Sequence, residues 1–154
     1  MDPQTPRIFS RQTACPDYTD YSTRKHPPYS TGPYQLPFQR PAVGCRLFKS
    51  TAAEALITQM TEKMADPDMA RLFENCFPNT LDTTVRWHLN AAKVEDKQSF
   101  IVTGDINAQW LRDSTNQLSQ YQLLVPKDDA LKNLILGAIN TQVRLFEGRQ
   151  GAVK

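Results

Sequence analysis

The sequence lacks most of the patterns that mark membrane, secreted or nucleic-acid-binding proteins. It has no run of about 18 apolar residues, so no helix is expected to cross a membrane. Its first residues, MDPQTPRIFSRQ, carry an acid and prolines where a secretory signal needs a basic start and an apolar core. The chain is therefore expected to be intracellular. A formal net charge of +2 is too small to predict binding to nucleic acid or to an anionic membrane.

Metal-binding patterns are also missing. The 3 cysteines and 2 histidines have neither a Cys-x-x-Cys nor a His-x-x-x-His spacing, so no metal and no other cofactor is predicted. Cys15, Cys45 and Cys76 are odd in number and far apart in the sequence. We expect them to be reduced thiols, with Cys76 buried as a packing residue.

Proline is abundant, but only at one end of the chain. Eight of the 11 prolines precede residue 45, and residues 1–44 show neither helical nor alternating periodicity. This segment is predicted to be an extended or disordered leader. Its interleaved Tyr and Arg residues are compatible with an RNA-binding tail. The favoured interpretation is a leader that lies over the domain or is loose.

From residue 45 onward the pattern favours helices. Ser50 is a good N-cap for a helix over 50–65, and Asp66 followed by Pro67 predicts the start of the next. Further helices are predicted from Asn107 to about 121 and over 126–143. Residues 99–106 are predicted to be a short strand or extended segment, and residues 83–88 fit either a helix or a strand. The fold class predicted is all-α.

A polar cluster in TGDINAQWLRDSTNQ, residues 103–117, suggests a binding site. Asp105, Trp110, Arg112 and Asp113 lie close together there with little aliphatic sequence between them. An indole packs on the apolar C–H face of a sugar, while carboxylates and a planar guanidinium bond pairs of neighbouring hydroxyls. The structural alternative is that Trp110 fills the core, the charged pair bonds neighbouring helices and Asp105 caps a helix. On composition alone, this alternative is favoured.

Longer motifs around the cluster resemble a known family. RLFENCFPNTLDTTVRW (71–87) and FIVTGDINAQWLRDSTNQLSQY (100–121) are similar to the signature of glycoside hydrolase family 125, and CRLFKS (45–50) fits its fungal members. The similarity runs from about Pro41 to about Val143. Asn107, Gln109 and Gln120 stand where the family more often has Pro, Met and Pro.

The resemblance implies a fold and an activity. Residues 45–143 would be the N-terminal helices of an (α/α)6 barrel, incomplete in this chain, in an inverting exo-acting mannosidase for α-1,6-linked mannose oligosaccharides. Asp105, Trp110, Arg112 and Asp113 would bind the terminal mannose, with Asn79 and Asp82 as weaker candidates.

The same resemblance assigns no catalytic residue to this chain. The family's acid and base lie further along the sequence than the matched region, and the tail 144–154 diverges from the family, as a truncated gene product would. The chain is therefore expected to be inactive alone. The alternative hypothesis is a non-catalytic carbohydrate-binding protein or a helical interaction protein.

Overall fold

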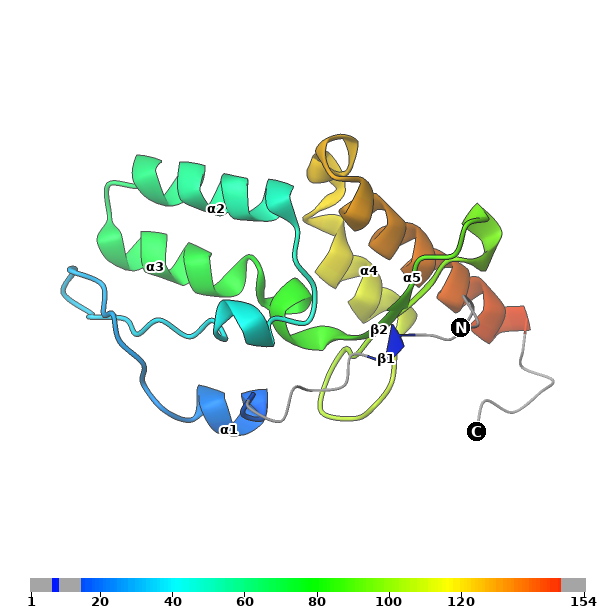
Figure 1. Cartoon of the computed structure of the whole chain (residues 1–154). Helices are drawn as coiled ribbons and strands as arrows, with labels where there is room; N and C mark the ends of the chain where they lie inside the picture. Colours follow the sequence, from blue (N-terminus) through cyan, green and yellow to red (C-terminus); the bar gives the residue numbers. More distant parts are fainter. Residues whose placement is uncertain (1–6, 9–14, 148–154) are drawn as a thin grey trace. The chain divides into compact units, whose positions relative to one another are not determined.

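The computed structural model describes residues 7–8 and 15–147, so the remaining parts of the predicted leader and tail lie outside the described residues. The chain forms two compact units. We call the first, with described residues 15–83, the N-terminal unit. The second, with described residues 84–147 and 7–8, is the C-terminal unit. Helices dominate in both units (Figure 1).

The N-terminal unit is built on two helices that run side by side, α2 (Thr51–Lys63) and α3 (Pro67–Cys76) (Figure 1). The predicted caps are confirmed. Ser50 Oγ accepts from the N–H of Ala53 at 3.1 Å, and Asp66 Oδ1 accepts from the N–H of Asp68 at 2.8 Å. A short helix α1 (Tyr18–Ser22), a 3-10 turn η1 (Val43–Cys45) and a π-helical turn η2 (Thr80–Thr84) complete the unit.

The Pro-rich segment follows an irregular path along α3 and is bonded to it. Asp68 accepts from Ser30 Oγ at 2.5 Å and from the N–H of Tyr34 at 2.9 Å. About two turns further along, the Asn75 amide accepts from the N–H of Gln39 and donates to the carbonyl of Pro37, both at 2.9 Å. Polar side chains on one helix thus replace the regular backbone bonds that this segment lacks.

The expectation for the cysteines is wrong. Cys15 and Cys45 form a disulfide, with their Cα atoms 5.6 Å apart. The two cysteines are 30 positions apart, and the irregular path of the chain between them brings the two sulfurs together, which residue spacing does not reveal. Cys76 is free but exposed rather than buried, because it lies on the face of α3 turned away from the core.

The C-terminal unit combines a small antiparallel sheet with helices, which corrects the all-α prediction. The sheet has the order β1 (Arg7–Ile8), β2 (Val85–Leu89), β3 (Gln98–Ile101). Trp87 on β2 lies opposite Phe100 on β3, and their rings stack at 5.9 Å. Residues 85–89 are therefore strand rather than helix, because the neighbouring strand supplies backbone partners and an aromatic pair.

Helix α5 (Asp129–Glu147) packs on β3, and the shorter α4 (Leu111–Ser119) lies beside α5 (Figure 1). The 3-10 turns η3 (Val94–Asp96) and η4 (Gln122–Lys127) precede β3 and α5. The core of the unit consists of buried apolar side chains from these elements: Val85, Ile101, Leu118, Tyr121, Leu124, Leu131, Leu134 and Ala138. Within the described chain, each helix is too short or too polar to span a bilayer.

The predicted helix cap at Asn107 is three residues too early. Trp110 has extended backbone angles (φ −69°, ψ 133°) and is the N-cap residue, so α4 begins at Leu111. Residues 102–110 form a loop instead, the yellow-green excursion between β3 and α4 in Figure 1.

Candidate functional site

The loop over residues 102–110 carries two of the predicted sugar-binding residues, and Thr103 closes it. The N–H and the Oγ1 of Thr103 both donate to the carbonyl of Ala108, at 3.1 and 3.0 Å. Thr103 Oγ1 also accepts from the N–H of Trp110 at 3.2 Å. One short polar side chain therefore ties the start of the loop to its end, next to the first turn of α4.

Two buried glutamines attach the end of this loop to the unit's core. The Gln109 side chain accepts from the N–H of Ile101 at 2.7 Å and donates to the carbonyl of Ala138 at 3.3 Å. Gln142 Nε2 donates to the carbonyl of Gln109 at 2.9 Å and to Ser114 Oγ at 3.2 Å. We call Gln109 and Gln142 the glutamine clasp. It joins the loop to β3, α4 and α5.

The four principal candidates all lie at the surface of the C-terminal unit. Asp105 is exposed on the loop, and Trp110 is 57% exposed at its end. On α4, the Arg112 side chain is 83% exposed and Asp113 is half-buried. Arg112 Nε donates to Asp113 Oδ1 at 3.3 Å. Trp110 thus does not fill the core, which removes one part of the structural alternative.

This surface has the chemistry that carbohydrate recognition requires. An exposed indole offers an apolar face to sugar C–H groups. A guanidinium and a carboxylate on the adjacent helical turn offer donors and acceptors to hydroxyls. Because the Arg112 side chain is exposed, its bond to Asp113 is solvent-accessible and weak enough to rearrange around a ligand.

The two weaker candidates belong to the N-terminal unit and differ from each other. Asn79 is exposed, and its side chain Oδ1 accepts from Thr83 Oγ1 at 3.2 Å. Asp82 is only 2% exposed and accepts from Arg40 Nε at 2.8 Å and from Arg40 Nη2 at 3.2 Å. The Asp82 carboxylate thus has both oxygens engaged within its own unit.

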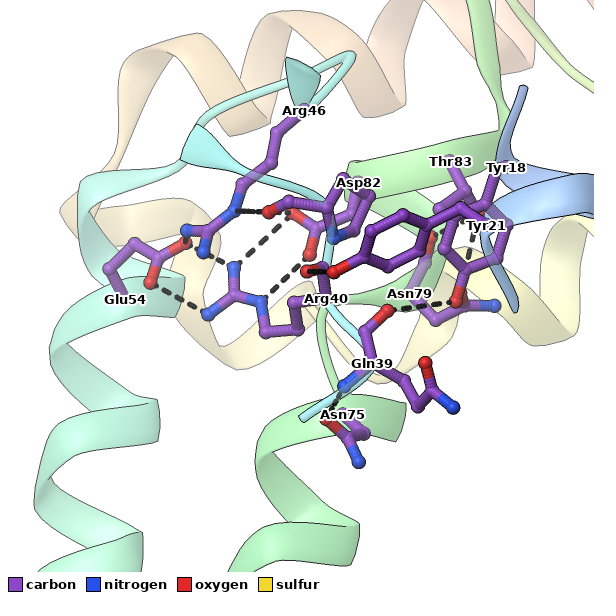
Figure 2. A network of polar contacts seen from close by, with 11 residues as sticks. Tyr18, Tyr21, Gln39, Arg40, Arg46, Glu54, Asn75, Asn79, Asp82 and Thr83 are labelled. Carbon is purple, nitrogen blue, oxygen red and sulfur yellow. Dashed lines mark hydrogen bonds and ion pairs between the residues drawn. The ribbon is translucent and has the colours of Figure 1, made fainter. Parts of the chain in front are cut away.

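Arg40 is the centre of a buried ion network that sequence reasoning missed (Figure 2). Besides Asp82, it donates to both oxygens of Glu54, at 2.5 and 3.0 Å. Arg46 Nη1 also donates to Glu54, at 3.0 Å. The network joins the Pro-rich segment to α2 and η2. Arg40 lies in a segment without periodic pattern, so no sequence motif pointed to it.

Burial and pairing oppose each other in this network. Burial alone would lower the pKa of the Arg40 guanidinium, but its hydrogen bonds to Glu54 and Asp82 raise it. The hydrogen bond from Arg40 lowers the pKa of Glu54, against the effect of burial. Burial raises the pKa of Asp82, while the Arg40 bonds favour its carboxylate form. Arg40 therefore stays charged and holds two carboxylates.

A cavity of about 180 Å³ adjoins this network in the N-terminal unit. Its walls include three aromatic rings and the disulfide, and the Arg40–Asp82 pair also contributes. The hydroxyls of Tyr18 and Tyr21 donate to the backbone carbonyls of Gln39 and Arg40, each at 3.3 Å (Figure 2). Tyr18, Tyr21 and Phe38 of the Pro-rich segment thus pack within the unit, whereas Tyr29 and Tyr34 are exposed. Across the residues that the structure describes, no group of three His, Cys, Asp or Glu side chains could hold a metal ion.

Comparison with known proteins gives two matches. A protein-family model described as "Metal-independent alpha-mannosidase (GH125)" matches residues 66–149. The meiotically up-regulated gene 157 protein of Schizosaccharomyces pombe (strain 972 / ATCC 24843) is 54% identical over 133 residues, which is 86% of this chain. The chain spans 26% of the length of that relative.

Proposed function

Because the chain belongs to glycoside hydrolase family 125, the metal-independent α-mannosidases, we propose that its C-terminal unit forms one wall of a mannose-binding pocket. The ligand is the terminal residue of an α-1,6-linked mannose oligosaccharide. Asp105, Trp110, Arg112 and Asp113 are the proposed contacts, all within this one unit. In this proposal, the helices of the chain are the N-terminal helices of an (α/α)6 barrel.

The observation that supports the proposal best is the exposure of Trp110 beside the Arg112–Asp113 pair. An exposed indole offers a flat apolar face on which the C–H groups of a sugar can pack. The glutamine clasp fixes the backbone at this position, so the indole is presented by a firmly held segment. Asp82 is the least suitable of the candidates, because a sugar would have to displace Arg40 from a buried ion pair.

We assign Asp105 and Asp113 to binding rather than to catalysis. An inverting glycosidase needs an acid and a base about 6.5–9.5 Å apart on opposite sides of the scissile bond. Both aspartates lie in one short stretch of sequence, with Trp110 and Arg112 between them, and are assigned to hydroxyl recognition. The proton transfers of hydrolysis would then depend on carboxylates from further segments of an enzyme.

Tryptophan fluorescence tests the binding proposal. The sequence has 2 tryptophans, and replacing Trp87 by Phe leaves Trp110 as the reporter. We expect mannose to change its emission, and Asp113→Asn to weaken binding about tenfold through loss of a charge-assisted bond. Arg112→Lys should also weaken binding, because Lys lacks the planar fork. Asp129→Asn, an exposed acid on α5, is the matched control and should bind like the parent.

An assay with α-1,6-linked mannobiose tests the assignment of roles. The purified 154-residue chain should bind this disaccharide without releasing mannose. If it does release mannose, and Asp113→Asn or Asp105→Asn abolishes the release, these carboxylates are catalytic and the binding-only assignment is wrong.

A second candidate function, a helical interaction protein, has one observation in its favour. A groove of about 270 Å³ runs between α4 and α5. Its lining includes large apolar side chains about half exposed to solvent: Leu111, Ile139, Val143 and Phe146. We call this the α4–α5 groove. If mannose fails to change Trp110 emission, this candidate becomes the preferred one.

A further inference from the structure

We propose that the glutamine clasp is a positioning device for sugar recognition: Gln109 and Gln142 set the place of the loop that carries Asp105 and Trp110. This inference rests on the proposed function for its consequence, but its structural part can be tested without any sugar. Neither glutamine would touch the ligand. Both would act through the backbone of residues 102–110.

The clasp is a buried link between the loop and the unit's core. Gln109 is buried, and its side-chain amide bonds two backbone groups on different elements, Ile101 on β3 and Ala138 on α5. Since an amide has a donor end and an acceptor end, this pairing fixes its orientation as well as its position. The backbone directly before Trp110 therefore cannot shift without breaking buried bonds.

Gln142, on α5, bonds the backbone of the same loop residue, Gln109. Its Nε2 donates both to the carbonyl of Gln109 and to Ser114 Oγ on α4. Ser114 belongs to the first turn of α4, and its N–H donates to the carbonyl of Trp110 at 2.9 Å. One amide group thus couples the end of the loop to the helix that carries Arg112 and Asp113.

This arrangement connects all four proposed sugar contacts. Asp105 and Trp110 would move with the loop, and Arg112 and Asp113 would move with α4. Gln142 bonds both segments. A displacement of about 1 Å in a recognition group can cost a large part of its interaction, so the register between loop and helix matters for affinity. Buried amides that are hydrogen-bonded suit this role, because an unmade buried bond is costly.

The variants that test the clasp keep the side-chain length and remove the amide. Gln109→Met removes the partners of the Ile101 N–H and the Ala138 carbonyl. Gln142→Met removes the bonds to Gln109 and Ser114. Leu134→Val is the matched control, because it makes a small cavity in the core on the same helix and leaves the loop's hydrogen bonds in place. All variants are made in the Trp87→Phe background.

The first measurement is amide hydrogen exchange without ligand. We expect the N–H groups of Thr103 and Trp110 to exchange at least about tenfold faster in both Met variants, since the loop opens locally. Trp110 should also become more accessible to acrylamide quenching. The Leu134→Val chain is compared with the Met variants at temperatures equally far below each variant's melting temperature. It should show neither the faster exchange nor the greater quenching. Parent-like exchange in both Met variants, or equally fast exchange in Leu134→Val, overturns the clasp.

The second measurement is mannose affinity from Trp110 fluorescence. The Met variants should bind about tenfold more weakly than the parent, while Leu134→Val keeps the parent's Kd. If the Met variants loosen the loop but keep the parent's Kd, the clasp does not position the sugar contacts and the inference fails. If the parent itself does not bind mannose, the proposed function fails, and hydrogen exchange still decides whether the clasp holds the loop.

Discussion

Arg40 and Asp82 form a two-point ion pair across 42 residues of sequence, with Nε–Oδ2 and Nη2–Oδ1 distances of 2.8 and 3.2 Å. Both side chains are buried, so neither charge can be solvated if the other is lost. The backbone near Asp82 is bonded as well, since its carbonyl accepts from the N–H of Leu47 at 3.0 Å. The pair thus joins three distant stretches of the N-terminal unit.

Replacing Asp82 by Ala should lower the free energy of unfolding by about 3–5 kcal/mol, because a buried guanidinium loses its buried carboxylate partner. Glu54→Ala is the control. The Glu54 side chain is 44% exposed, and Arg40 keeps Asp82 in that variant, so a loss of about 1 kcal/mol or less is expected. Urea unfolding of both variants measures the difference. Equal losses would mean that burial does not distinguish the two carboxylates.

Gly137→Ala should destabilise the C-terminal unit by about 1–3 kcal/mol. A Cβ at this position would lie 2.7 Å from the carbonyl carbon of Gln98 and 2.9 Å from the N of Ser99, and backbone atoms cannot move away easily. Gly44→Ala is the matched control, because its Cβ would meet nothing within 4 Å. Thermal unfolding should separate the two variants. A neutral Gly137→Ala would mean that α5 can move off β3 at little cost.

Stability should fall as the pH drops below about 6.5, the ordinary pKa of histidine. Burial lowers the pKa of the His88 imidazole, whose Nδ1 lies 2.8 Å from Ser99 Oγ. The unfolded chain therefore takes up a proton in a pH range where the folded chain does not, and acid favours unfolding by at most about 1.4 kcal/mol per pH unit. Melting curves between about pH 7.5 and 5.5 measure this slope. His88→Gln should flatten it, and an unchanged slope would assign it to other groups.

The α4–α5 groove should make the purified chain self-associate as its concentration rises, because contiguous apolar surface in water favours contact between molecules. Ile139→Lys places a charge in the groove and should reduce the association. Leu123→Lys is the control: Leu123 is 87% exposed but does not line the groove. Light scattering over a concentration series compares them. A stronger effect of Leu123→Lys would locate the association elsewhere.

Local features of the fold were predictable where neighbouring residues decide them. Ser50 and Asp66 start helices because a capping side chain bonds backbone groups two or three residues ahead, which a sequence pattern records. The start of α4 was misplaced because Asn107 is also a common capping residue. The long-range bonds of Thr103 and Gln109 keep residues 102–110 out of the helix.

The candidate site was predictable in its residue types but not in its supports. Motifs placed Trp110, Arg112 and Asp113 together, whereas their exposure depends on how α4 and α5 pack. Gln109 gave one signal: it stands where the family more often has Met, and an amide there needs buried partners. The partners themselves, Ala138 and Gln142, come from a helix about 30 residues away, so no local pattern identifies them.

The disulfide between Cys15 and Cys45 makes the formation of the native chain depend on the redox conditions. Two thiols must lose two electrons to form this bond, which closes a loop of the chain that contains α1. The yield of native chain should therefore increase with the amount of oxidant. Cys76, exposed and unpaired, is the thiol that competes for a partner during that step. Folding in glutathione buffers of different ratios would therefore alter which of three sulfurs remains single.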